Sequence, residues 1–115
     1  MIYPKQPRKK KRIKHPASIL QIKDGTCYLC ARLQGDFRIH TYLEEHHIFP
    51  GNPGRRISEE NGLKVYLCLP HHRGSAAAVH ENRQNMQLIQ QDAQRAYEAE
   101  HSHEEWMQLI GKSYL

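Results

Sequence analysis

The chain has 115 residues, of which 38% are hydrophobic, and a mean hydropathy of −0.82, so it has room for one domain with a small core. No apolar segment is long enough to cross a bilayer, and no apolar stretch follows the basic amino terminus as in a secretory signal. We therefore expect a cytoplasmic protein that does not enter a membrane. The net charge is +5, but residues 1–14 contain seven of the 17 basic side chains and none of the 12 acidic ones, which leaves a net charge of −2 on the remainder.

The first 16 residues are predicted to form a flexible basic arm before a single domain over residues 17–115. Three prolines in this segment disfavour a helix. An arm of this kind can bind nucleic-acid phosphates without sequence preference. The side chains expected to make this contact are Lys9, Lys10, Lys11 and Arg12. The same composition would suit a solvated tail or a nuclear-localisation signal.

The middle of the chain is predicted to contain short strands and turns. Residues 19–22 are expected to form a strand that enters a knuckle over residues 26–31, and residues 37–42 are expected to be extended. Residues 63–67 alternate apolar and polar side chains, so they should pair with residues 42–49 as a hairpin. The run rich in Gly and Pro between these two segments predicts a long loop.

Two helices are predicted after a further loop over residues 70–79. Apolar residues recur at three- and four-residue steps between residues 82 and 100, which indicates the first helix. The sequence Ser102-His-Glu-Glu105 is a capping box that opens the second helix. Gly111 is placed to end it.

Two pairs of metal-binding side chains share one spacing. Cys27 and Cys30 enclose two residues, and so do Cys68 and His71. This spacing can place four soft ligands around one Zn²⁺. Three cysteines cannot all pair as disulfides, which favours thiolates bound to zinc over a disulfide framework. We therefore expect a structural zinc site that supplies part of the folding free energy.

These pairs belong to a longer pattern, in which Cys-x2-Cys is followed by His46-His47, then Asn61, then a Cys-x2-His-His segment that ends at His72. The pattern closely resembles that of the HNH endonucleases supported by zinc. The resemblance implies an α+β fold, with a zinc knuckle and a ββα-metal (His-Me finger) core over residues 24–82 and a helical extension over residues 82–111. The extension is similar to that of small HNH proteins of phages and prophages. A bacterial or phage-infected host cell is implied, with DNA and phage packaging or recombination proteins as candidate partners.

The resemblance also implies metal-dependent hydrolysis of DNA phosphodiester bonds. His47, which precedes an apolar residue, corresponds to the general base. His46 corresponds to a ligand of a catalytic divalent metal, which could be Mg²⁺, Mn²⁺, Ni²⁺ or Zn²⁺. His72 corresponds to a second ligand. His80 is either a further ligand or a residue at the entry to the following helix.

Asn61 corresponds to the middle letter of the motif and is expected to fix the hairpin and to orient the ring of His47. It could also be a turn residue, because Gly62 follows it, and Asn52 is an alternative for the same role. His71 stands where this kind of nuclease commonly has a cysteine, and zinc accepts either ligand.

Three arginines flank the proposed site in sequence and could bind DNA phosphates: Arg55, Arg56 and Arg73. A solvated loop would also explain the first two. No base-reading helix is evident, so weak sequence preference is expected. An interpretation from another class is a non-catalytic zinc module that binds nucleic acid without cutting it. The pair His46-His47 favours the nuclease, because a binding module needs no base beside an open metal position.

Overall fold

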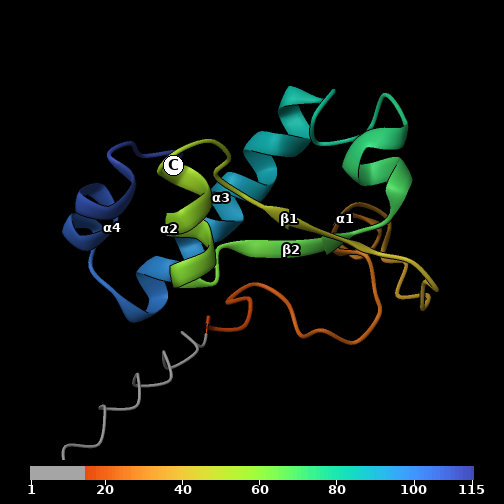
Figure 1. Ribbon diagram of the computed structural model, residues 1–115, viewed down its shortest axis with the longest axis horizontal. Coiled ribbons are helices and arrows are strands. Elements are labelled where there is room, and N and C mark those ends of the chain that lie inside the picture. The colour runs from red at the N-terminus through yellow and green to blue at the C-terminus, as the bar shows by residue number, and fades with distance from the viewer. Residues whose placement is uncertain (1–14) are drawn as a thin grey trace, which may run out of the picture.

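The computed structural model describes residues 15–115 and shows a small α+β fold with a two-stranded sheet and helices (Figure 1). The predicted basic arm therefore lies almost entirely outside the described residues, including Lys9, Lys10, Lys11 and Arg12. Within residues 15–115, no helix is both long enough and apolar enough to cross a bilayer. The elements in chain order are α1 (Tyr28–Gln34), β1 (Glu44–His47), α2 (Gly54–Asn61), β2 (Lys64–Leu67), η1 (Pro70–Gly74, a π-helical turn), α3 (Arg83–Glu100) and α4 (His103–Ile110).

The predicted hairpin is confirmed. β1 and β2 pair in antiparallel register, with Glu45 opposite Tyr66, His46 opposite Val65 and His47 opposite Lys64. Because side chains alternate along a strand, the hairpin has two chemically different faces. The face that contains His46 also contains Glu44, Val65 and Leu67. The other face contains the side chains of Glu45, His47, Lys64 and Tyr66.

The connection between the strands is a helix, α2, rather than the predicted long loop. Its residues follow the Gly/Pro-rich run, and the hydroxyl of Ser58 accepts from the backbone N–H of Phe49 and donates to its carbonyl, at 3.1 and 3.2 Å. Gly62 ends the helix with a left-handed φ of 67°, and a Cβ there would lie 2.3 Å from the carbonyl oxygen of Ala17. Asn61-Gly62 is thus a helix end and not a hairpin turn.

Two segments differ from the expected strands. Residues 19–22 form no strand, but Gln21 accepts from the backbone N–H of Tyr66 through its side chain at 2.8 Å, and Ile19 donates to Gly62 at 3.0 Å. Isolated hydrogen bonds, and not a regular ladder, therefore hold this segment beside β2 and the residue Gly62 that precedes it. Residues 37–42 make only one bridge, between Ile39 and Thr26. The loop predicted over residues 70–79 begins with η1.

Both carboxyl-terminal helices are confirmed. Asn82 caps α3, the capping box at Ser102 opens α4, and Gly111 ends α4 in the left-handed region. Trp106 is fully buried, packs edge-on against Phe49 with 5.7 Å between ring centroids, and donates to the carbonyl of Lys112 at 2.9 Å. These helices therefore cover the α2 end of the hairpin. The end that leads to η1 and α1 is on the other side of the molecule (Figure 1).

Candidate metal centres and the two faces of the hairpin

Cys27, Cys30, Cys68 and His71 form a buried cluster that could bind a structural metal such as zinc. The Nδ1 atom of His71 lies 3.5, 3.3 and 3.3 Å from the sulfurs of the three cysteines in chain order, and 3.8 Å separates the sulfurs of Cys30 and Cys68. A tetrahedral zinc with ordinary bond lengths requires about 3.5 Å between sulfur and nitrogen and about 3.8 Å between two sulfurs. The expected ligand set therefore has the spacing of a zinc site.

The secondary structure brings these four ligands together. Cys27 is the residue before α1 and Cys30 is within its first turn, whereas Cys68 follows β2 and His71 is in η1. The backbone carbonyl of Cys68 accepts from the N–H groups of His71 and His72, at 3.1 and 2.9 Å, so the turn folds back on the cysteine. All three cysteines are free thiols, which agrees with the zinc interpretation and not with a disulfide.

The protonation of the cluster also suits a metal. Burial, together with the neighbouring Cys27 and Cys68, raises the pKa of the Cys30 thiol to about 12, and burial is also the main cause that raises the pKa of Cys68. Burial lowers the pKa of His71, so its imidazole is neutral and can act as a ligand. Thiolates in such a place require a compensating cation.

Three histidines form a second cluster on the Glu44–His46 face of the hairpin. His46 from β1, His72 from η1 and His80 from the segment before α3 bring their nearest ring nitrogens within 4.8 Å of one another. The Nε2 atoms of His72 and His80 are 3.1 Å apart. The Nε2 atom of His46 is buried and has no hydrogen-bond partner among the described residues. Burial, and then the neighbouring His72 and His80, lower the pKa of His46 to about 3. Neutral imidazoles with converging nitrogens are able to ligate a divalent metal.

Glu44 orients one member of this cluster and was not singled out in the sequence. Its carboxylate accepts from Nδ1 of His72 at 3.0 Å, from Arg73 at 2.8 and 2.9 Å, and from the hydroxyl of Tyr42 at 2.8 Å. Arg73, followed by His72 and Tyr42, lowers the pKa of Glu44 to about 2. Because Nδ1 of His72 is bound to Glu44, its Nε2 atom is the nitrogen that faces the other two histidines and could bind a metal. Arg73, which was predicted to bind DNA phosphate, makes a bidentate ion pair with this carboxylate.

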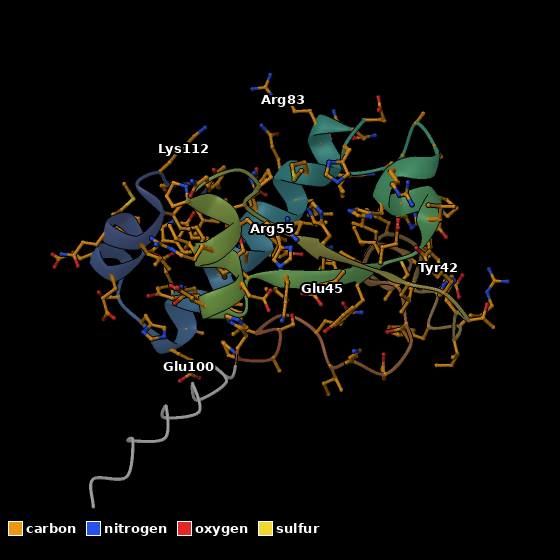
Figure 2. All side chains as sticks on the ribbon, viewed as in Figure 1. Tyr42, Glu45, Arg55, Arg83, Glu100 and Lys112 are labelled. Carbon is orange, nitrogen blue, oxygen red and sulfur yellow. The ribbon has the colours of Figure 1, made fainter. Side chains whose placement is uncertain are left out.

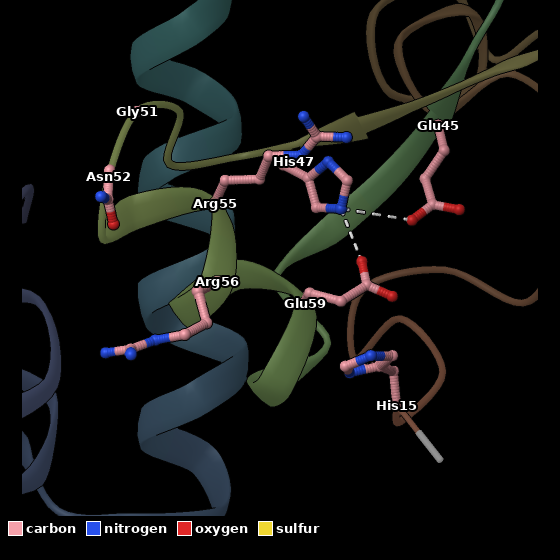
Figure 3. Close-up of a pocket in the computed structure, with 8 residues that line it drawn as sticks. All are labelled: His15, Glu45, His47, Gly51, Asn52, Arg55, Arg56 and Glu59. Atoms are coloured by element: carbon pink, nitrogen blue, oxygen red, sulfur yellow. Dashed lines mark hydrogen bonds and ion pairs between the residues drawn. The ribbon is translucent and has the colours of Figure 1, made fainter. Parts of the chain in front are cut away.

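His47 lies on the opposite face, beside two carboxylates. Its Nε2 atom is 2.5 Å from Glu59 of α2 and 3.5 Å from Glu45 of β1 (Figure 3). Asn61 does not make the expected hydrogen bond to His47, because its side chain donates to the carbonyl of Ile57 at 2.9 Å, within α2. Among the described residues, Glu59 orients the ring in its place. Glu59 was not predicted from the sequence, because its contact with His47 depends on the position of α2, which was expected to be a loop.

An open pocket of about 1030 Å³ borders His47. Arg55 and Arg56, which were expected in a loop or at a phosphate, are in the first turn of α2. Figure 3 shows the Arg55 side chain extending toward His47, whereas Arg56 points away from it. In Figure 2, Arg55 and Tyr42 lie beyond opposite ends of β1. The pocket is lined by His15, Glu45, His47, Gly51, Asn52, Arg55, Arg56 and Glu59.

Comparisons with models of protein families, with curated proteins and with solved structures found no significant match to this chain.

Proposed function

We propose that the protein is a zinc-supported HNH endonuclease that uses a divalent metal to hydrolyse DNA phosphodiester bonds with little sequence preference. In this proposal β1, β2 and the turn η1 are its ββα-metal core. The observation that supports it best is that the last two residues of β1, His46 and His47, contact different groups of side chains on opposite faces of the hairpin. His46 joins two other imidazoles on one face, and its neighbour His47 lies beside a pocket with Arg55 on the other.

The residues present fit a catalytic metal. Three imidazoles converge, and the buried Nε2 atom of His46 lacks any hydrogen bond within residues 15–115 that would satisfy it. Three protein ligands leave positions for water and phosphate, as catalytic sites require. The metal would supply electrostatic stabilisation of charge on the phosphate and on the leaving oxygen. His46, His72 and His80 would hold it.

His47 is the proposed general base. In the reaction a water molecule loses a proton to the imidazole and its oxygen bonds to phosphorus, while the bond from phosphorus to the leaving oxygen breaks. His46 and His47 are the last two residues of the strand, so a phosphodiester placed across the strand end would be able to contact both. Arg55 would bind an adjacent phosphate, because its guanidinium extends into the same pocket (Figure 3).

The test is nicking of supercoiled DNA in the presence of divalent metal. We expect His47→Ala to lower turnover by roughly 10²–10⁴-fold, the usual effect of losing a general base, with little change in the metal concentration needed for half-maximal activity. His103→Ala is the matched control, since His103 is an exposed histidine on α4 that pairs with Glu98 and not with a residue of the proposed site.

A second candidate is a zinc module that binds nucleic acid without cutting it, for which the Cys₃His cluster alone would suffice. Binding of DNA without metal-dependent nicking by the native protein would favour this module. Equal nicking by the native protein, His46→Ala, His47→Ala and His72→Ala would reject the proposed catalytic site.

A further inference from the structure

The environment of His47 contains a group of charged side chains that the proposed reaction does not yet use. Lys64 is the cross-strand partner of His47 and shares its face of the hairpin. Its ammonium lies 3.2 Å from Glu59 and 3.4 Å from Glu45, and both of these carboxylates face the same nitrogen of His47. Two strands and α2 therefore converge on one edge of one imidazole ring.

This group has the composition of a metal site, but its geometry argues for another role. Glu45, His47 and Glu59 bring three potential ligand atoms within 4.8 Å of one another. However, the ammonium of Lys64 is already bound to both carboxylates, and only 9% of the Lys64 side chain is exposed. A built-in cation in that place compensates the two negative charges and would repel a second one. Lys64 therefore fixes the two carboxylates where they can accept a hydrogen bond from His47.

The contact between Glu59 and His47 fixes the identity of the hydrogen-bond donor. His47, followed by Lys64, lowers the pKa of Glu59, so its carboxylate is ionised and can only accept hydrogen bonds. At 2.5 Å from this carboxylate, Nε2 of His47 must carry the hydrogen. In a neutral imidazole the other nitrogen, Nδ1, then has the free lone pair. Figure 3 shows this nitrogen directed away from both carboxylates, on the side where the Arg55 guanidinium lies.

We propose that Glu59, held by Lys64, is a positioning residue that keeps His47 in its Nε2–H form, so that Nδ1 accepts the proton from the attacking water. The role in the reaction rests on the proposed nuclease function, whereas the form of the imidazole does not. A carboxylate behind a histidine base orients the ring and stabilises the imidazolium that forms when the proton is transferred. The water would approach from the Arg55 side, where the guanidinium can bind a phosphate adjacent to the one that is attacked.

Nuclear magnetic resonance of the full-length, ¹⁵N-labelled protein tests the first half of this inference. Two-bond ¹H–¹⁵N correlations of the histidine rings distinguish the Nε2–H from the Nδ1–H form, and the signals of His47 are those lost in His47→Ala. We expect native His47 to be in the Nε2–H form, and Glu59→Ala to give a mixture of both forms. Glu59→Gln should largely retain the native form, because its amide oxygen can still accept from Nε2.

Nicking kinetics test the second half. We expect Glu59→Ala to lower turnover by roughly 10–100-fold, as for other residues that orient a reacting group, with the half-saturating metal concentration unchanged. Glu59→Gln should recover part of this loss. Glu60→Ala is the matched control, since Glu60 is the next residue of α2, is exposed and pairs with Arg56 instead of His47.

Three results would overturn the proposal: an Nδ1–H form in the native protein, faster nicking by Glu59→Ala, or equal losses in Glu59→Ala and Glu60→Ala. Faster nicking would mean that Glu59 blocks the base. If the native protein does not nick DNA but His47 keeps the Nε2–H form only when Glu59 is present, the nuclease function fails and the positioning of the ring still holds.

Discussion

The Cys₃His cluster and the cluster of three histidines share one segment of chain but differ in enclosure. η1 directs His71 into the first cluster and the adjacent His72 into the second. All four members of the first cluster are buried. In the second cluster His46 is buried, His72 is partly buried and His80 is exposed. Four enclosed ligands are typical of structural metal sites, and three ligands at the surface leave room for substrate. Adjacent residues of one turn therefore contribute to two potential metal sites that differ in enclosure.

The largest expected effect lies in the enclosed cluster. Cys68→Ser should remove the structural zinc and unfold the hairpin, because apparent binding free energies of structural zinc are about 10–16 kcal/mol and the whole stability of a domain is about 5–15 kcal/mol. Elemental analysis and a thermal melt followed by circular dichroism measure both changes. His80→Ala, in the open cluster, should keep this zinc and the native melt. If Cys68→Ser keeps its zinc and its melting temperature, the cluster is not a structural metal site.

The open cluster should respond to metal concentration instead. We expect His46→Ala and His72→Ala to lose nicking activity at low metal and to regain part of it as metal is raised, because a ligand acts through occupancy of the site. The loss at low metal should exceed the roughly 10–100-fold typical of residues around the ligands. His47→Ala should show no such recovery. Recovery of His47→Ala but not of His46→Ala would show that the two roles are reversed.

A smaller effect is expected at Glu44, which contacts His72 from outside the cluster. Glu44→Ala should weaken binding of the proposed catalytic metal by roughly 10–100-fold, because the variant has no group that accepts from Nδ1 of His72 and orients its ring. Metal titration of nicking measures this change, and the zinc content of the Cys₃His cluster should remain constant. Tyr42→Phe removes another hydrogen bond to the same carboxylate and is the control. Equal effects of the two variants would show that Glu44 acts only through the local fold.

Features with a local sequence signal were predicted well. The helices α3 and α4 have apolar periodicity and caps, and apolar and polar side chains alternate along the hairpin strand β2. Each of these elements can therefore be recognised from its own residues. The four members of the Cys₃His cluster were also predicted to lie together, since their spacing is a property of the sequence itself. In contrast, α2 follows a Gly/Pro-rich run and has no side-chain cap at its start, although it is as long as α4. Its position depends on Ser58 binding the backbone of Phe49, a tertiary contact that no local pattern reports.

At the two histidine sites, too, some residues were predicted from the sequence and others were not. His46, His72 and His80 were named from the sequence, but the partners that orient the rings were not. Glu59 approaches His47 only because α2 packs against β1, so no spacing could have identified it. Glu44 had a weak signal, since it is two residues before His46 and therefore on the same face of a strand. Asn61 was assigned to His47 by resemblance, and the structure bonds it within its own helix.

The basic arm is expected to have the smallest effect, because it lies outside both clusters in sequence. Removing residues 1–14 deletes seven positive charges and leaves a domain with a net charge of −2. Each phosphate contact of the arm that is lost should make the slope of log affinity against log salt shallower by about 0.9 on duplex DNA. Nicking by the truncated chain should persist at saturating DNA, since every residue proposed for the reaction lies within the described domain. DNA binding measured by fluorescence anisotropy at several salt concentrations gives the slope for both chains. An identical slope would show that the arm does not contact DNA, and loss of nicking at saturating DNA would show that the arm is part of the reaction site.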